Sequence, residues 1–169
     1  MDARSENQPT PLKNRTMAER KSDRELVVTR TVNGPARIVF EAWTKADLFK
    51  RWWIPKSFGL TVLSCEMDVR VGGKYRLVIS HSGSSMEFFG KYLDVTPHSR
   101  LSWTNEEGGQ EGPVTTVTFE EQAGKTRLVV HDLYPSKEAL DEAIASGSCS
   151  GMPETLDQLD ELLATLAAS

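Results

Sequence analysis

The feature that most constrains the fold is an amphipathic helix predicted at the C-terminal end, over residues 153–167. Its leucines recur three and four positions apart, at Leu156, Leu159, Leu162, Leu163 and Leu166. Acidic side chains occupy the opposite face of the same helix. An apolar stripe of this kind must be buried against another element. Because strand-like patterns dominate the chain before this helix, its expected partner is a sheet.

Seven segments are β-branched or alternate between apolar and polar residues, which is typical of strands. They are residues 25–32, 60–69, 74–80, 86–95, 100–105, 114–121 and 126–133. Gly90 interrupts one of them and predicts a bulge or a close approach between backbones. Turn residues separate neighbouring segments, so we expect antiparallel pairing.

Helical spacing appears at three further places. Pro35 opens a short helix that carries Ile38, Val39, Ala42 and Trp43, and residues 45–53 form a second one that Pro55 ends. Residues 135–146 are expected to form a third helix. The order predicts an α+β helix-grip fold, in which a curved antiparallel sheet of about six to seven strands wraps around the C-terminal helix. Two short helices follow the first strand, residues 25–168 form one domain, and an elongated space remains between sheet and helix.

Composition narrows the classes of partner and location. The net charge of −4 and the isoelectric point of about 5.5 disfavour nucleic acid, because the phosphate backbone attracts basic proteins. No apolar run approaches a membrane span, so we expect no membrane insertion. Residues 1–24 are polar and predict a disordered tail, with Met17 as an alternative start. Cys65 and Cys149 lie far apart and match no CxxC or zinc spacing, which indicates reduced thiols and a cytoplasmic protein. Both monomer and homodimer remain open.

Several motifs resemble a known family. They are residues 25–42 (ELVVTRTVNGPARIVFEA), Trp52-Trp53-Ile54-Pro55, residues 65–73 (CEMDVRVGG), residues 116–119 (TVTF), and residues 133–137 (LYPSK) with Gly151 and residues 156–160 (LDQLD). In this order they resemble the activator-of-Hsp90-ATPase-like branch of the SRPBCC superfamily, also called START-like or polyketide-cyclase-like, in its single-domain bacterial form. The resemblance implies a helix-grip fold that binds lipids, polyketides or similar molecules. Met152 stands where this branch often has an aromatic residue.

The sequence offers no metal or cofactor site. His81, His98 and His131 are isolated, and none has a partner at metal-ligand spacing. Residues 147–151 (GSCSG) have the outline of a nucleophile elbow, but a helix rather than a strand precedes them, which favours a break between helices. Gly72-Gly73 lacks the following helix of a phosphate cradle.

Two charged residues lie on the same strand face as apolar neighbours and are therefore predicted to face the core. Arg30 shares the parity of Leu26 and Val28, and Asp132 that of Val130. A lone buried charge is costly, so these residues need a partner. The possible partners are each other, another residue such as Glu66, or a polar group of a ligand. An ion pair or a strand-end position near water is favoured over a ligand contact.

The expected ligand contacts combine these polar anchors with apolar side chains. They are Arg30, Trp53, Phe58, Tyr75, Leu77, Phe88, Trp103, Asp132, Met152 and Leu156. The favoured function is binding of a hydrophobic or amphipathic small molecule, without an identifiable activity. One alternative is an enzyme of the cyclase or dehydratase kind, with Asp132 as the base and Arg30 or Tyr75 steering an oxyanion. Another is an interaction protein with a chaperone partner.

Overall fold

The computed structural model describes residues 16–106, 112–146 and 151–168. Its strands are β1 (Met17–Arg20), β2 (Glu25–Val32), β3 (Thr61–Met67), β4 (Lys74–His81), β5 (Ser84–Thr96), β6 (Arg100–Thr104), β7 (Val114–Gln122) and β8 (Lys125–Leu133). Its helices are α1 (Ala36–Thr44), α2 (Ala46–Trp52), the 3₁₀ turn η2 (Lys56–Phe58), α3 (Lys137–Ala145) and α4 (Met152–Ala168). The predicted order of elements is confirmed.

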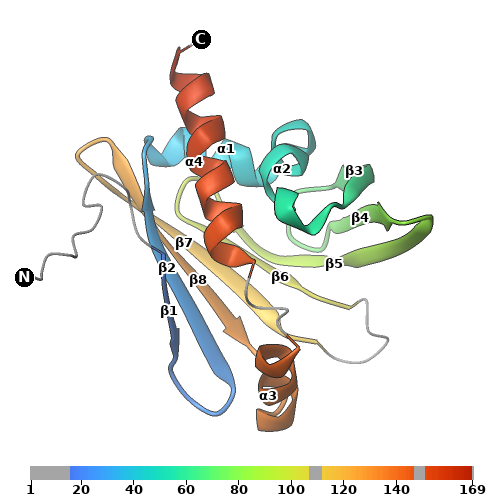
Figure 1. Cartoon of the computed structure of the whole chain (residues 1–169). Helices are drawn as coiled ribbons and strands as arrows, with labels where there is room; N and C mark the ends of the chain where they lie inside the picture. The colour runs from blue at the N-terminus through green and yellow to red at the C-terminus, as the bar shows by residue number, and fades with distance from the viewer. Residues whose placement is uncertain (1–15, 107–111, 147–150, 169) are drawn as a thin grey trace, which may run out of the picture.

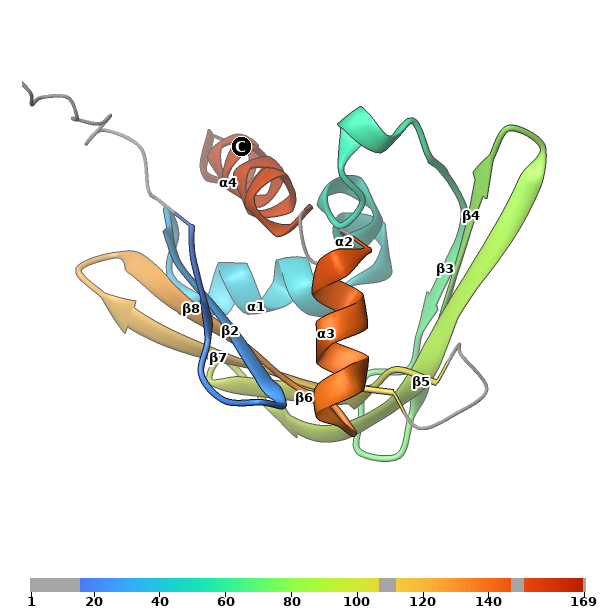
Figure 2. The ribbon, with the colours of Figure 1, turned by 60° about the horizontal axis from the view of Figure 1, so that its bottom comes forward.

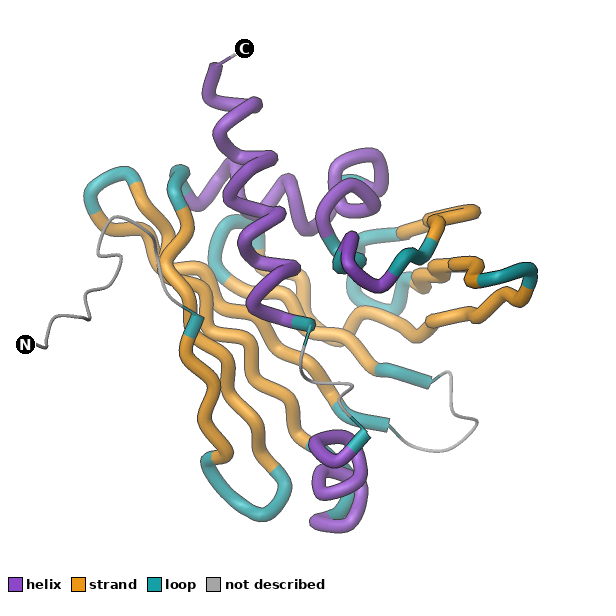
Figure 3. Tube along the Cα trace, viewed as in Figure 1, coloured by secondary structure: helices purple, strands orange, loops and turns teal. Residues whose placement is uncertain are grey.

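The strands form one antiparallel sheet in the order β1-β2-β8-β7-β6-β5-β4-β3. The sheet curves strongly, and α1, α2 and α4 lie on its concave side (Figures 1 and 2). Figure 3 shows β3, the last strand at one end of the sheet, beside α2. The α+β helix-grip prediction is therefore confirmed. Eight strands exceed the predicted six to seven because β1 was not foreseen.

The core lies between the sheet and these helices. Leu156, Leu159 and Leu163 of α4 are fully buried, as the leucine spacing predicts. They belong to the same apolar cluster as Trp43 of α1 and the inward side chains of β2, β7 and β8. Along β2 every second residue is buried, which is the pattern of a strand with one covered face.

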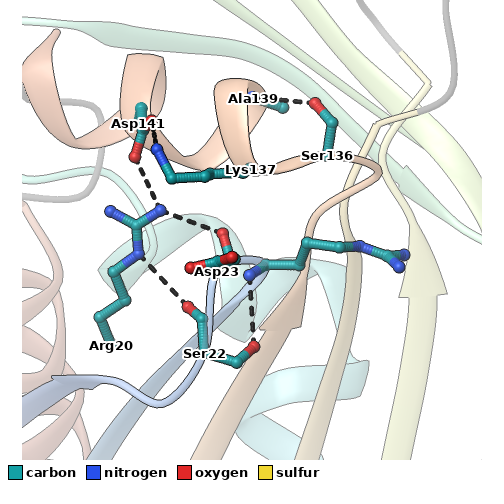
Figure 4. Close-up of polar contacts among 8 residues, drawn as sticks. Arg20, Ser22, Asp23, Ser136, Lys137, Ala139 and Asp141 are labelled. Carbon is teal, nitrogen blue, oxygen red and sulfur yellow. Dashed lines mark hydrogen bonds and ion pairs between the residues drawn. The ribbon is translucent and has the colours of Figure 1, made fainter.

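The predicted tail is wrong at its C-terminal end, because Met17–Arg20 forms β1 and pairs with residues 26–29 of β2. Arg20 anchors the strand further (Figure 4): its guanidinium donates to the carbonyl of Asp23 at 3.0 Å and pairs with Asp141 of α3 at 2.7 Å. Ser136 caps α3 by accepting from the amide of Ala139. The strand has only four residues and all of them are exposed, so it carries no alternation for a sequence pattern to detect. Residues 1–15 lie outside the described chain.

Within the described ranges, no helix combines the length and the apolarity that crossing a bilayer requires. The expected break between helices covers residues 147–151, and most of it, including Cys149, lies outside the described residues. The side chain of Cys65 is partly buried and forms no disulfide.

Candidate functional site

A cavity of about 300 Å³ lies between the sheet and the helices. Two cross-strand rows of side chains form much of its wall, because residues paired in register on one face lie side by side. One row joins Cys65, Leu77 and Phe88 across β3, β4 and β5, and the other joins Trp103, Thr115 and Asp132 across β6, β7 and β8. All six residues line the cavity. The curvature of the sheet makes these two rows opposite walls of one space.

Aromatic rings close the helical side of the cavity. Phe49 of α2 stacks on Trp53 with ring centroids 4.8 Å apart. Trp53 lies edge-on to Trp43 at 5.6 Å and to Trp103 at 6.4 Å. Rings that pack on one another in this way hold each other in place, so this wall is rigid and apolar.

Polar side chains of α4 position that wall from outside. The amide nitrogen of Gln158 donates to the carbonyls of Trp52 and Ile54, each at 2.9 Å, and its oxygen accepts from the amide of Lys56 at 2.8 Å. Gln158 is buried, and it satisfies backbone groups that α2 leaves unpaired where the helix ends. The segment that carries Trp53 is thereby fixed relative to α4.

A chain of hydrogen bonds runs along the polar edge of the cavity. Asn105 donates from Nδ2 to the carbonyl of Pro113 at 2.8 Å and to Oγ1 of Thr115 at 3.1 Å. The hydroxyl of Thr115 donates to Oδ1 of Asp132 at 2.5 Å. Tyr75 donates to the carbonyl of Thr104 at 2.8 Å. This edge concentrates polar groups in a cavity that is otherwise largely apolar.

Burial changes the acidity of three groups in the wall. Burial raises the pKa of Asp132 above its usual range, although the hydrogen bond from Thr115 lowers it in part. Burial likewise raises the pKa of the Cys65 thiol and of the Tyr92 phenol. The cavity therefore favours the uncharged form of each of these groups.

Gly90 permits the close contact on which this edge depends. A Cβ atom at Gly90 would lie 2.1 Å from the carbonyl oxygen of Thr104, the same oxygen that accepts from Tyr75. Only a residue without a side chain fits there. The close approach predicted for this glycine is confirmed.

Arg30 is buried as predicted but does not line the cavity. Its guanidinium bonds Asp157 at 2.7 Å and Asp160 at 2.6 Å, both on α4, and also Thr16 at 3.0 Å. The favoured ion pair is confirmed with partners other than Asp132 and Glu66. The role of Arg30 as a ligand anchor or oxyanion guide is therefore wrong. The helical spacing of Asp157 and Asp160 was the signal available in the sequence.

Two apolar members of the predicted site also lie elsewhere. Phe58 is 47% exposed at the end of η2, and its ring lies close to Gly151. Leu156 is fully buried in the core and does not reach the cavity. Trp53, Tyr75, Leu77, Phe88, Trp103, Asp132 and Met152 do line it.

The predicted site did not include several cavity residues that bear polar groups, among them Cys65, Asn105 and Thr115. Thr115 shares the parity of Val117 and Phe119, which placed it on the inner face, and this signal went unused. Asn105 follows β6 directly, and nothing in its neighbours distinguishes it from an ordinary loop residue. Among the described residues, no cluster of three or more His, Cys, Asp or Glu side chains is arranged to hold a metal ion.

A curved sheet that grips a helix and leaves a cavity beside it defines the START-like class of proteins. The sequence matches the family described as "Activator of Hsp90 ATPase homolog 1-like protein" over residues 33–164, and the chain belongs to this family. No curated protein shows significant similarity to the sequence.

Solved structures of bacterial proteins share the fold. One from Nitrosomonas europaea is 23% identical, with a TM-score of 0.80 over 89% of this chain and 100% of its own. One from Rhodobacter sphaeroides is 24% identical, with a TM-score of 0.81 over 89% and 99%. One from Staphylococcus epidermidis is 28% identical, with a TM-score of 0.75 over 88% and 94%.

Proposed function

We propose that this protein binds a small hydrophobic or amphipathic molecule in the cavity between the sheet, α1, α2 and the start of α4. The observation that carries the proposal is the make-up of the wall, which is mainly aromatic and aliphatic and carries a hydrogen-bonded polar edge at Asn105, Thr115 and Asp132. Pockets of about this size with few, grouped polar atoms are typical of small-molecule sites. Met152 at the rim adds a side chain that can repack around different ligands.

Native mass spectrometry of protein purified from its own host tests this proposal directly. We expect a small molecule that is retained in the folded protein and released on denaturation. Cys65→Phe places a ring in the cavity and should abolish retention. Leu63→Phe is the matched control, because Leu63 lies on the same strand and is 58% exposed. Equal retention by both variants would place the molecule elsewhere on the protein.

A surface interaction, as the family description suggests for a chaperone activator, makes the opposite prediction. The protein would then carry no small molecule, and a chaperone would co-purify equally with wild type and Cys65→Phe. That result would overturn the binding proposal in favour of the interaction.

A further inference from the structure

The hydrogen-bond chain at the polar edge determines how the carboxyl group of Asp132 is used. Asn105 donates both hydrogens of Nδ2, one to the carbonyl of Pro113 and one to Oγ1 of Thr115. Because the oxygen of Thr115 accepts this bond, its own hydrogen is directed to Oδ1 of Asp132. Oδ1 is therefore occupied as an acceptor. A proton on the carboxyl group must then sit on Oδ2.

No described residue forms a hydrogen bond or an ion pair with Oδ2. The neighbouring His131 lies on the other face of β8 and bonds Glu25 at 2.8 Å. Arg76, which lines the cavity from β4, pairs with Glu87. No described cation bonds Asp132, and desolvation outweighs the lowering effects of Thr115 and His131 on its pKa, so a negative charge there is expensive.

Protonation of Asp132 removes the uncompensated negative charge. A protonated Asp132 presents an O–H donor at Oδ2, and the raised pKa of this group agrees with that form. A neutral carboxylic acid in an apolar site can act as a hydrogen-bond donor to a ligand oxygen. An unpaired donor in a largely apolar cavity calls for an acceptor, and a bound molecule can supply one.

We propose that the ligand is a neutral aromatic or conjugated molecule whose carbonyl oxygen accepts a hydrogen bond from the carboxyl group of Asp132. The aromatic wall formed by Phe49, Trp53 and Trp103 suits the flat part of such a molecule, through stacked and edge-on contacts. This inference rests on the proposed binding function and names the class of molecule that the same cavity selects.

An organic ammonium ion is the competing class, since aromatic rings and a carboxylate together attract cations. The two classes require opposite states of Asp132. A carbonyl needs the protonated acid, so its binding should weaken as pH rises through the pKa of Asp132. An ammonium ion needs the carboxylate, so its binding should strengthen over the same range.

Other titratable groups that face the cavity are Glu66 of β3, Arg76 of β4, and Cys65, Tyr75, Tyr92 and Tyr134. Burial keeps Cys65 and Tyr92 neutral to higher pH than usual. Arg76 is paired with Glu87. Asp132 is the acidic group that Thr115 holds at the polar edge. A variant of Asp132 therefore shows which part of the pH dependence comes from this carboxyl group.

Three probes of one shape test the inference by calorimetry: 2-acetylnaphthalene, 2-isopropenylnaphthalene and 1-(2-naphthyl)ethylamine. The ketone offers a carbonyl, the alkene replaces that oxygen with carbon, and the amine offers a cation. We expect the ketone to bind about threefold to tenfold more tightly than the alkene, since one net hydrogen bond distinguishes them. Its affinity should fall as pH rises.

Two variants provide the controls. Asp132→Asn keeps an acceptor for Thr115 and places an N–H donor at the Oδ2 position, so ketone affinity should persist without pH dependence. Asp132→Leu removes the donor, so ketone and alkene should bind equally. Alkene binding by Asp132→Leu also shows whether that variant keeps its cavity.

Three results would overturn the inference. Equal binding of ketone and alkene to the wild type would remove the anchor while leaving the binding function intact. Tighter binding of the amine, lost in Asp132→Asn, would assign the cavity to cations. Failure of all three probes to bind, with a bare polypeptide in the native mass spectrum, would reject the binding function itself.

Discussion

Arg30 lies almost entirely inside the protein, with 4% of its side chain exposed, and holds two carboxylates of α4. Asp160 is 15% exposed and also accepts from the backbone amide of Asn33. Replacing Arg30 with Met would leave Asp160 without its guanidinium in a partly buried place. Asp157 is 58% exposed and can be solvated, so we expect a loss of about 2–3 kcal/mol rather than the full cost of a buried pair. Urea unfolding measures this loss.

Arg127→Met is the matched control at the residue scale. Arg127 lies on β8 and pairs with Glu120 at 3.4 Å, but both side chains are about half exposed. Exposed pairs contribute between about 0 and 1 kcal/mol because water and salt screen them. Equal destabilisation by the two substitutions would show that burial of Arg30 adds nothing to its ion pairs.

At the scale of elements, the junction between β5 and β6 depends on Gly90. Gly90→Ala would force the strands apart or displace the carbonyl of Thr104, and we expect a cost of about 1–3 kcal/mol from this overpacking. The substitution should also weaken the bond from Tyr75 to that carbonyl. Gly34→Ala is the control, since its Cβ would meet Leu163 at an ordinary 3.7 Å. Chemical denaturation that finds both variants equally stable would contradict the close approach.

Patterns along single elements predicted the fold because each element buries one face. The leucines of α4 and the alternation in β2 or β8 are visible without knowledge of any partner. Contacts between elements were harder to predict. Arg30 and Asp132 share the same kind of parity, yet one meets α4 and the other faces the cavity. The register of β7 on β8 and the crossing of α4 decide that difference, and local spacing does not encode either.

At the scale of the whole molecule, the cavity is a gap in the packing between the curved sheet and the helices. Arg30 and Gln158 hold α4 against β2 and the end of α2, and among the described residues of α4 only Met152 lines the cavity. The wall then contains a carboxyl group that the fold neither pairs with a cation nor fully exposes to water. Folding must therefore favour the protonated form of Asp132, and the stability of the entire domain is linked to pH through this group.

Asp132→Asn is expected to become more stable relative to the wild type as pH rises. Burial raises the pKa of Asp132 in the folded protein above its ordinary value of 3.8, so the unfolded chain releases this proton first. Between pH 3.8 and the pKa of Asp132 in the folded protein, the free energy of unfolding of the wild type then falls by up to about 1.4 kcal/mol per pH unit. Above that pKa, the contribution of Asp132 to the free energy of unfolding is constant. Glu25, Asp141 and Glu154, whose pKa values hydrogen bonds lower, titrate alike in both proteins and cancel in the difference. Urea unfolding of both proteins over a pH series gives this difference. A difference that does not change with pH would mean that Asp132 ionises as freely in the folded protein as in water.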